Sequence, residues 1–210
     1  MKYIVILIIF ICSGVGATEL SQKDVQKIKE KLNTFSNIKG EFSQTKTLHD
    51  INLELKSTGK FTFMKKAGFI WETVSPIKSV MVYAIKEDIR QNEMCIIFDN
   101  NGEKTIEKKQ VKQTDEIYDT IQSILRGDVE KLNEIFRISY SQKERGWKLL
   151  LDSKKNIVGS FINQIVITGN NDIIQSLVMT VPNKDKISIE FHDISKILET
   201  QDAEKISCNQ

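Results

Sequence analysis

The stretch from Gly59 to Ile85, GKFTFMKKAGFIWETVSPIKSVMVYAI, contains three segments in which apolar and polar residues alternate. A period of two is typical of half-buried β-strands, because successive side chains point to opposite faces of a sheet. Two lysines and a glycine separate the first two segments, and Pro76 separates the second from the third. Three strands with such short connections predict an antiparallel meander.

The same alternation recurs on both sides of this stretch. We expect about six strands before a helical insertion and about five after it, near 38–47, 52–64, 69–74, 77–85, 93–98, 103–111, 136–141, 146–152, 160–168, 172–182 and 186–192. A sheet with so many strands tends to curl or close on itself. The predicted fold class is therefore mainly β (α+β): one highly curved antiparallel sheet, or incomplete β-barrel.

Two regions have the spacing of amphipathic helices. Ser21 can cap the first helix, with Asp24 three residues later as in a capping box. The second region, from Thr114 to Ile135, is interrupted at Gly127, and Asp128 can restart the helix. Because a curled sheet has a concave face, we expect the helices to cover it and to enclose an apolar cavity, with the insertion as a lid.

The N-terminal residues predict a secretory signal peptide. A lysine precedes an apolar run at 3–12, and small residues follow up to Ala17. Cys12 would suit a lipoprotein signal, but the bulky isoleucine before it favours cleavage after Ala17 instead. We therefore expect a signal peptide at 1–17 and a single, exported domain at 18–210.

Charge and motif content argue against several functions. The chain has 30 Lys and Arg against 28 Asp and Glu, interleaved rather than gathered in a basic stripe, so we expect no nucleic-acid partner. His49 and His192 lie far apart and have no metal-ligand spacing. No nucleotide-binding or nucleophile-elbow motif occurs after the leader. We expect neither an enzyme nor a metal or other cofactor.

Two cysteines remain after the leader, and export would permit a disulfide between them. Cys95 lies in an apolar segment, whereas Cys208 is the third residue from the polar C-terminus. Since unpaired cysteines are common in protein cores, we expect two independent thiols, although the sequence leaves their pairing open.

The order of motifs resembles the outer-membrane lipoprotein carrier proteins, the LolA-like family. That family has a strand with F-x-Q, a strand with G-x-aromatic-x-aromatic, a basic turn, and a Trp followed by a Pro. The matching residues are Phe42, Gln44, Gly59, Phe61, Phe63, Lys65, Lys66, Phe69, Trp71 and Pro76. The layout matches over nearly the whole mature chain, whereas the specific motifs are confined to 38–76.

The resemblance implies a non-enzymatic carrier that shields acyl chains while moving them across the periplasm toward the outer membrane. The implied partners are the acyl chains of a lipoprotein or lipid, an inner-membrane donor protein or an outer-membrane acceptor protein, and we expect a monomer. In the family, an Arg in the basic turn holds the lid closed. Here Lys65 and Lys66 occupy that turn, and Lys does not reproduce the several directed hydrogen bonds of Arg.

The expected cavity wall comprises Phe42, Phe61, Phe63, Phe69, Trp71, Met81 and Tyr83, and the expected lid residues are Ile117, Ile121, Ile124 and Leu125. Aromatic contacts across strands could alone explain the wall as ordinary core. The alternative is an apolar concave site for a ligand. A lipid-sensing or protein-interaction module that does not transport is the second functional hypothesis, and an enzyme with a polar cluster in its cleft is the third.

Overall fold

The computed structural model describes residues 20–33, 36–85, 93–100, 103–110, 116–154, 161–197 and 206. Over these residues the fold is mainly β, as predicted, with one sheet of eleven antiparallel strands and three helices. The helices are α1 (Gln22–Asn33), α2 (Glu116–Arg126) and α3 (Val129–Ile135). The strands before α2 are β1 (Ile38–Leu48), β2 (Leu53–Met64), β3 (Gly68–Ser75), β4 (Ser79–Ala84), β5 (Glu93–Asn100) and β6 (Glu103–Gln110). The strands after α3 are β7 (Phe136–Lys143), β8 (Gly146–Ser153), β9 (Gln164–Asn170), β10 (Ile173–Thr180) and β11 (Lys186–Lys196).

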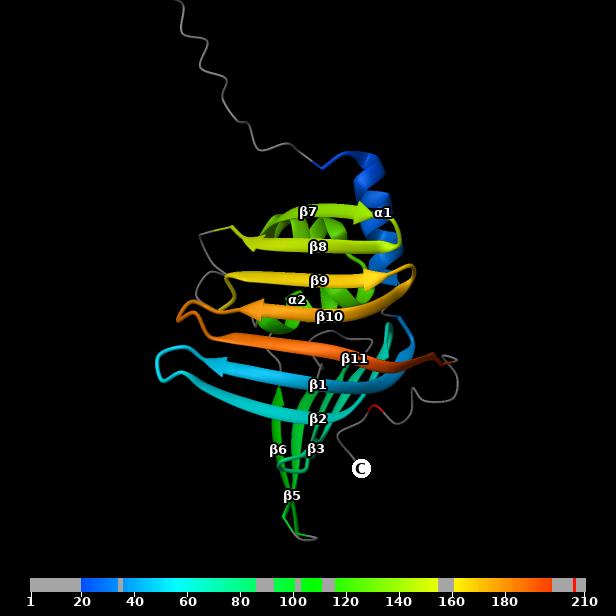
Figure 1. Ribbon diagram of the computed structural model, residues 1–210. Helices are drawn as coiled ribbons and strands as arrows, with labels where there is room; N and C mark the ends of the chain where they lie inside the picture. Colours follow the sequence, from blue (N-terminus) through cyan, green and yellow to red (C-terminus); the bar gives the residue numbers. More distant parts are fainter. Residues whose placement is uncertain are drawn as a thin grey trace, which may run out of the picture.

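The strand order is β6-β5-β4-β3-β2-β1-β11-β10-β9-β8-β7. Two meanders therefore meet where β1 pairs with β11, and β6 and β7 form the two edges. In Figure 1, strands β7 to β10 run across the view while β5 and β6 run down it, so the sheet twists and curls between its edges. Right-handed twist between neighbouring strands accumulates in this way over a wide sheet.

The helix ends follow the capping expected from the sequence. The Ser21 hydroxyl accepts a hydrogen bond from the Asp24 backbone N–H at 3.1 Å and donates one to the Asp24 carboxylate at 2.6 Å. Asp128 caps α3 by accepting a hydrogen bond from the Lys131 backbone N–H at 3.0 Å. Gly127, between α2 and α3, has a φ of 68°, a left-handed conformation that glycine adopts without steric cost.

The main core lies between the concave face of the sheet and the helices. It joins Ile28 and Leu32 of α1 to Ile124 and Leu125 of α2 and to the inward-facing side chains of the strands. A second, smaller cluster lies on the opposite, convex face, and its buried members are Met64, Val82, Ala84, Cys95 and Ile206. We call it the convex-face cluster. Because Ile206 belongs to it, a residue that follows β11 in the chain packs on this face of the sheet.

Cys95 corrects one expectation about this second cluster. Its side chain is fully buried, as the apolar surroundings predict, but it is disulfide-bonded rather than a free thiol. The apolar segment around Cys95 correctly predicted that its side chain is buried. The bond itself depends on where another cysteine is brought in space, which sequence spacing does not give.

Candidate functional site

The pairing of β2, β3 and β4 places the sequence-predicted wall residues in two rows on the concave face. Phe61 pairs with Trp71, which pairs with Met81, and Phe63 pairs with Phe69, which pairs with Tyr83. Residues directly opposite on antiparallel strands share one face, so all six side chains point toward the helices. The structure therefore confirms the antiparallel meander that the alternation predicted, and these pairs give its register.

Phe42 reaches the same rows from β1 by crossing β2. Its ring stacks on that of Trp71, with centroids 3.8 Å apart and the planes at 24°. Gly59 is the β2 residue opposite Phe42, and a Cβ built on it would lie 2.8 Å from the Phe42 ring. The glycine of the G-x-F-x-F motif thus leaves room for an aromatic ring to bridge three strands.

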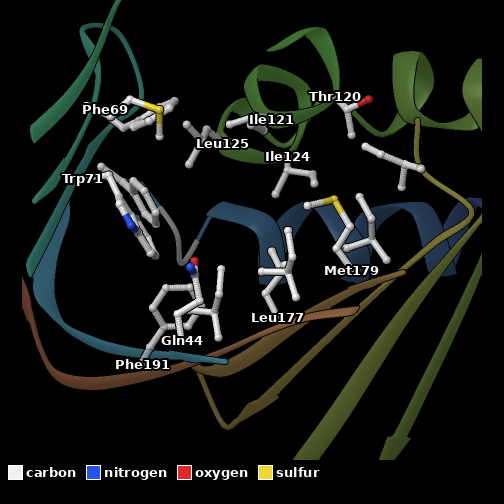
Figure 2. Close-up of a pocket in the computed structure, with 16 residues that line it drawn as sticks. Gln44, Phe69, Trp71, Thr120, Ile121, Ile124, Leu125, Leu177, Met179 and Phe191 are labelled. Carbon is white, nitrogen blue, oxygen red and sulfur yellow. The ribbon is translucent and has the colours of Figure 1, made fainter. Parts of the chain in front are cut away.

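A cavity of about 240 Å³ lies between this face and α2. Figure 2 shows α2 with Ile121, Ile124 and Leu125 on one side and Gln44, Trp71, Leu177 and Phe191 on the sheet side. The sixteen lining residues are Gln44, Phe63, Phe69, Trp71, Met81, Thr120, Ile121, Ile124, Leu125, Ile162, Ile165, Leu177, Met179, Ile187, Ile189 and Phe191. All but Gln44 and Thr120 are apolar, so the cavity is suited to a hydrocarbon chain.

Part of the sequence-predicted site lines this cavity and part lies beside it. Phe63, Phe69, Trp71 and Met81 are lining residues, as are Ile121, Ile124 and Leu125 of the expected lid. The other three wall residues, Phe42, Phe61 and Tyr83, are buried in the same core without lining the cavity. The side chain of Ile117 lies outside the described part of the chain.

The second meander contributes a half of the wall that the sequence prediction missed. These residues are Ile162, Ile165, Leu177, Met179, Ile187, Ile189 and Phe191, from β9, β10, β11 and the approach to β9. Their alternation was a usable signal, but only the pairing of β11 with β1 brings them opposite the first meander. Ile189 of β11, for example, pairs directly with Gln44 of β1, and both line the cavity.

Two polar residues interrupt the apolar lining. The Gln44 amide donates a hydrogen bond to the Ser57 hydroxyl at 3.3 Å, across the β1–β2 pair. Thr120, on α2, is completely buried, and its Oγ1 has no hydrogen-bond partner. Among the lining residues, all of which the structure describes, Thr120 alone has a polar atom without a hydrogen-bond partner. A buried hydroxyl without a partner is unfavourable.

Lys65 of the basic turn contacts α1 and the segment that follows it. The Lys65 ammonium donates a hydrogen bond to Asn33 Oδ1 at 2.9 Å, and its backbone N–H donates to Asn37 Oδ1 at 3.1 Å. Asn33 lies beside the α2–α3 turn, because a Cβ built on Gly127 would be 3.5 Å from Asn33 Oδ1. Lys65 is therefore linked to the α2–α3 turn through Asn33 of α1, and Lys66 is exposed.

An ion pair joins α1 to α3. The Lys29 ammonium lies 2.7 Å from the Glu130 carboxylate, and both side chains are more than one-third exposed. The hydrogen bond from Lys29 is the main cause that lowers the pKa of Glu130. This ion pair therefore contributes to the stability of the fold at pH values above the usual pKa of Glu. That contribution is lost as the pH falls through the lowered pKa of Glu130. Exposed ion pairs of this kind contribute little to stability.

The described residues contain no grouping of three His, Cys, Asp or Glu side chains that could hold a metal ion. None of the helices in the described ranges is long and apolar enough to cross a membrane. What the site offers is an apolar space with two uncharged polar groups at its wall.

Comparison with known proteins identifies the fold family. The family model described as outer membrane lipoprotein carrier protein LolA matches residues 33–204. Among curated proteins, none matches the chain.

The solved structures that match this chain include proteins from two organisms. A LolA superfamily protein from Nitrosomonas europaea is 9% identical, with a TM-score of 0.42, over 87% of this chain and 97% of that chain. A chain of the MucA/MucB complex from Pseudomonas aeruginosa is 8% identical, with a TM-score of 0.48, over 88% of this chain and 59% of that chain. At these scores neither likeness bears on what this chain binds.

Proposed function

Because the chain belongs to the LolA family of outer-membrane lipoprotein carrier proteins, we propose that it holds acyl chains of a lipoprotein or lipid in the cavity beneath α2. In this proposal it moves them through the periplasm toward the outer membrane, after a signal peptide at 1–17 has been removed. The family is a carrier family and not an enzymatic one. The observation that carries the proposal is the apolar cavity between the concave face and α2.

The free energy of binding would come from removing methylene groups from water. Each buried methylene contributes about 0.8 kcal/mol, so about ten of them contribute roughly 8 kcal/mol before the costs of association. Such an interaction needs no directed contact, which agrees with a lining that is apolar except at Gln44 and Thr120. The same lining would accept acyl chains of different cargo molecules.

The small size of the cavity supports a proposed movement of α2 when cargo binds. Its volume of about 240 Å³ is below the range of roughly 300–1,000 Å³ that is usual for ligand pockets. A cargo with more than one acyl chain therefore requires α2 to shift away from the sheet. Because α2 contributes Thr120, Ile121, Ile124 and Leu125 to the wall, such a shift would widen the cavity directly.

Release of cargo from membranes tests this function. The purified protein is incubated with inner-membrane vesicles, and acylated molecules are measured in the soluble fraction after the vesicles are removed. A carrier is expected to bring acylated cargo into the soluble fraction in proportion to its own concentration. Lipid binding without such release would favour a non-transporting lipid sensor, and the absence of both would contradict the proposal.

A further inference from the structure

Most of the exposed large apolar side chains of the described residues lie at one end of the sheet. Five of them belong to the β1–β2 and β3–β4 connections and the strand ends beside them: Ile51, Leu53, Leu55, Val74 and Ile77. Because Thr58 is opposite Ser75, β3 ends beside the middle of β2, and residues 53–57 of β2 extend from there to the β1–β2 connection at the same end of the sheet. We call these five residues the apolar tip.

The apolar tip is continuous with the cavity along the concave face. Ile187 lines the cavity and pairs with Lys46 of β1, which pairs in turn with Leu55 of β2. The next residues on the same face are Leu48 and its partner Leu53. A path along β2 therefore leads from the cavity to the β1–β2 connection, with Leu55 and Leu53 on it and two polar residues, Lys46 and Ser57, between them and the cavity.

The charges around the apolar tip are mainly positive. The segments 46–56, 74–78 and 181–186 contain five lysines against three acidic residues. The lysines are Lys46, Lys56, Lys78, Lys184 and Lys186, and the acids are Asp50, Glu54 and Asp185. Glu54 lies 3.8 Å from the Lys56 ammonium, and the Asp185 carboxylate accepts hydrogen bonds from the His49 backbone N–H and the Asn183 amide. Two of the three acids and one of the five lysines are thus already engaged within the protein.

We propose that the apolar tip docks on the surface of a bilayer that contains anionic lipids, with the path along β2 leading from that surface to the cavity. Contiguous exposed apolar side chains mark interaction surfaces. Apolar residues flanked by lysines are suited to the membrane interface, where the former enter the acyl boundary and the latter attract anionic headgroups. This goes beyond the proposed function, because a carrier could also receive its cargo from a protein alone.

Vesicle flotation with matched variants tests the docking surface. The double variant Ile51→Ser/Ile77→Ser removes the two most exposed residues of the tip, which are 66% and 63% exposed. The matched control is Ile106→Ser/Ile173→Ser, with exposed isoleucines on β6 and β10 away from the tip. With vesicles of phosphatidylethanolamine and phosphatidylglycerol, we expect the tip variant to bind about tenfold more weakly or worse and the control to bind normally.

A second readout separates docking from cavity binding. Binding of a soluble fluorescent fatty acid should be unchanged in the tip variant, and wild-type flotation should weaken with salt. Flotation of the tip variant at the wild-type level, or no flotation of the wild type, would overturn the docking surface. Wild-type flotation that depends on the tip, in a protein that binds no fatty acid, would support the docking surface while contradicting the proposed function.

Discussion

At the scale of single residues, the aromatic wall depends on Gly59, because the packing leaves no room for a side chain at this position. A Cβ at this position would lie 1.8 Å from the Glu72 carbonyl oxygen and 2.8 Å from the Phe42 ring. Neither the backbone of β3 nor the stacked ring can move without breaking the Phe42–Trp71 contact. The glycine is therefore required by packing.

We expect Gly59→Ala to lower the free energy of unfolding by about 3 kcal/mol or more, because it forces a backbone clash in the core. Denaturant unfolding measures the change. Gly146→Ala is the matched control, since a Cβ there meets nothing closer than 3.6 Å. Equal stability of the two variants would show that the ring does not bridge the strands over Gly59.

Replacing Thr120 is expected to change the free energy of unfolding in the opposite direction. Thr120→Val removes a buried hydroxyl that has no partner, so we expect the empty protein to become more stable by about 1 kcal/mol. Thr168→Val is the comparison, because the Thr168 hydroxyl lies 2.7 Å from that of Ser176 and its loss should be destabilising. Thermal unfolding of both variants measures the difference, and a destabilised Thr120→Val protein would contradict the account of this hydroxyl.

The wall could be predicted from the sequence only in part. Alternation along each strand correctly placed Phe61 with Phe63, and Phe69 with Trp71, because parity is a local property; that the two pairs share one face follows from the pairing of β2 with β3. It could not distinguish lining residues from Phe42, which is buried beside the cavity by its stacking on Trp71. Gln44 was visible in the F-x-Q motif, but its position at the cavity follows from packing across strands.

At the scale of elements, α2 is the part of the wall that the proposed function requires to move. Its apolar spacing was sufficient to predict a helix over the sheet, and Ile121, Ile124 and Leu125 do line the cavity. The contact of the basic turn with α1 was not predictable, since it depends on Asn33 at the far end of another helix.

Ile121→Asp places a carboxylate against the apolar wall, where an unpaired charge is strongly disfavoured. We expect binding of a fluorescent fatty acid to fall at least about tenfold, with some loss of stability. Asn133→Asp adds the same charge at an exposed position of α3 and should leave both properties unchanged. Normal fatty-acid binding by Ile121→Asp would contradict the placement of α2 as a cavity wall.

At the scale of the whole molecule, the join between β1 and β11 creates the cavity. Each meander was readable from alternation and turn residues, but their relative order was not, because pairing between distant strands leaves no local signal. For the same reason the sequence revealed one half of the wall and missed the half contributed by β9, β10 and β11.

The disulfide of Cys95 ties a distant part of the chain to the convex face. Ile206 packs in the same convex-face cluster as Cys95, so we expect Cys208 to be its partner. Removing the bond with Cys95→Ala should lower stability by about 2–4 kcal/mol, because the unfolded chain regains freedom. Peptide mapping without reduction should recover the two cysteines in one linked species, and two separate thiol peptides would contradict this pairing.

The central claim is that the cavity beneath α2 holds an acyl chain, and photo-crosslinking tests it most directly. A fatty acid carrying a diazirine near its methyl end is bound to the protein and activated by light, and the modified peptides are identified by mass spectrometry. We predict modification of peptides that contain cavity residues from both meanders and from α2, such as Trp71, Ile121 and Leu177. Modification confined to peptides outside the cavity, or none above the level of a denatured control, would contradict the claim.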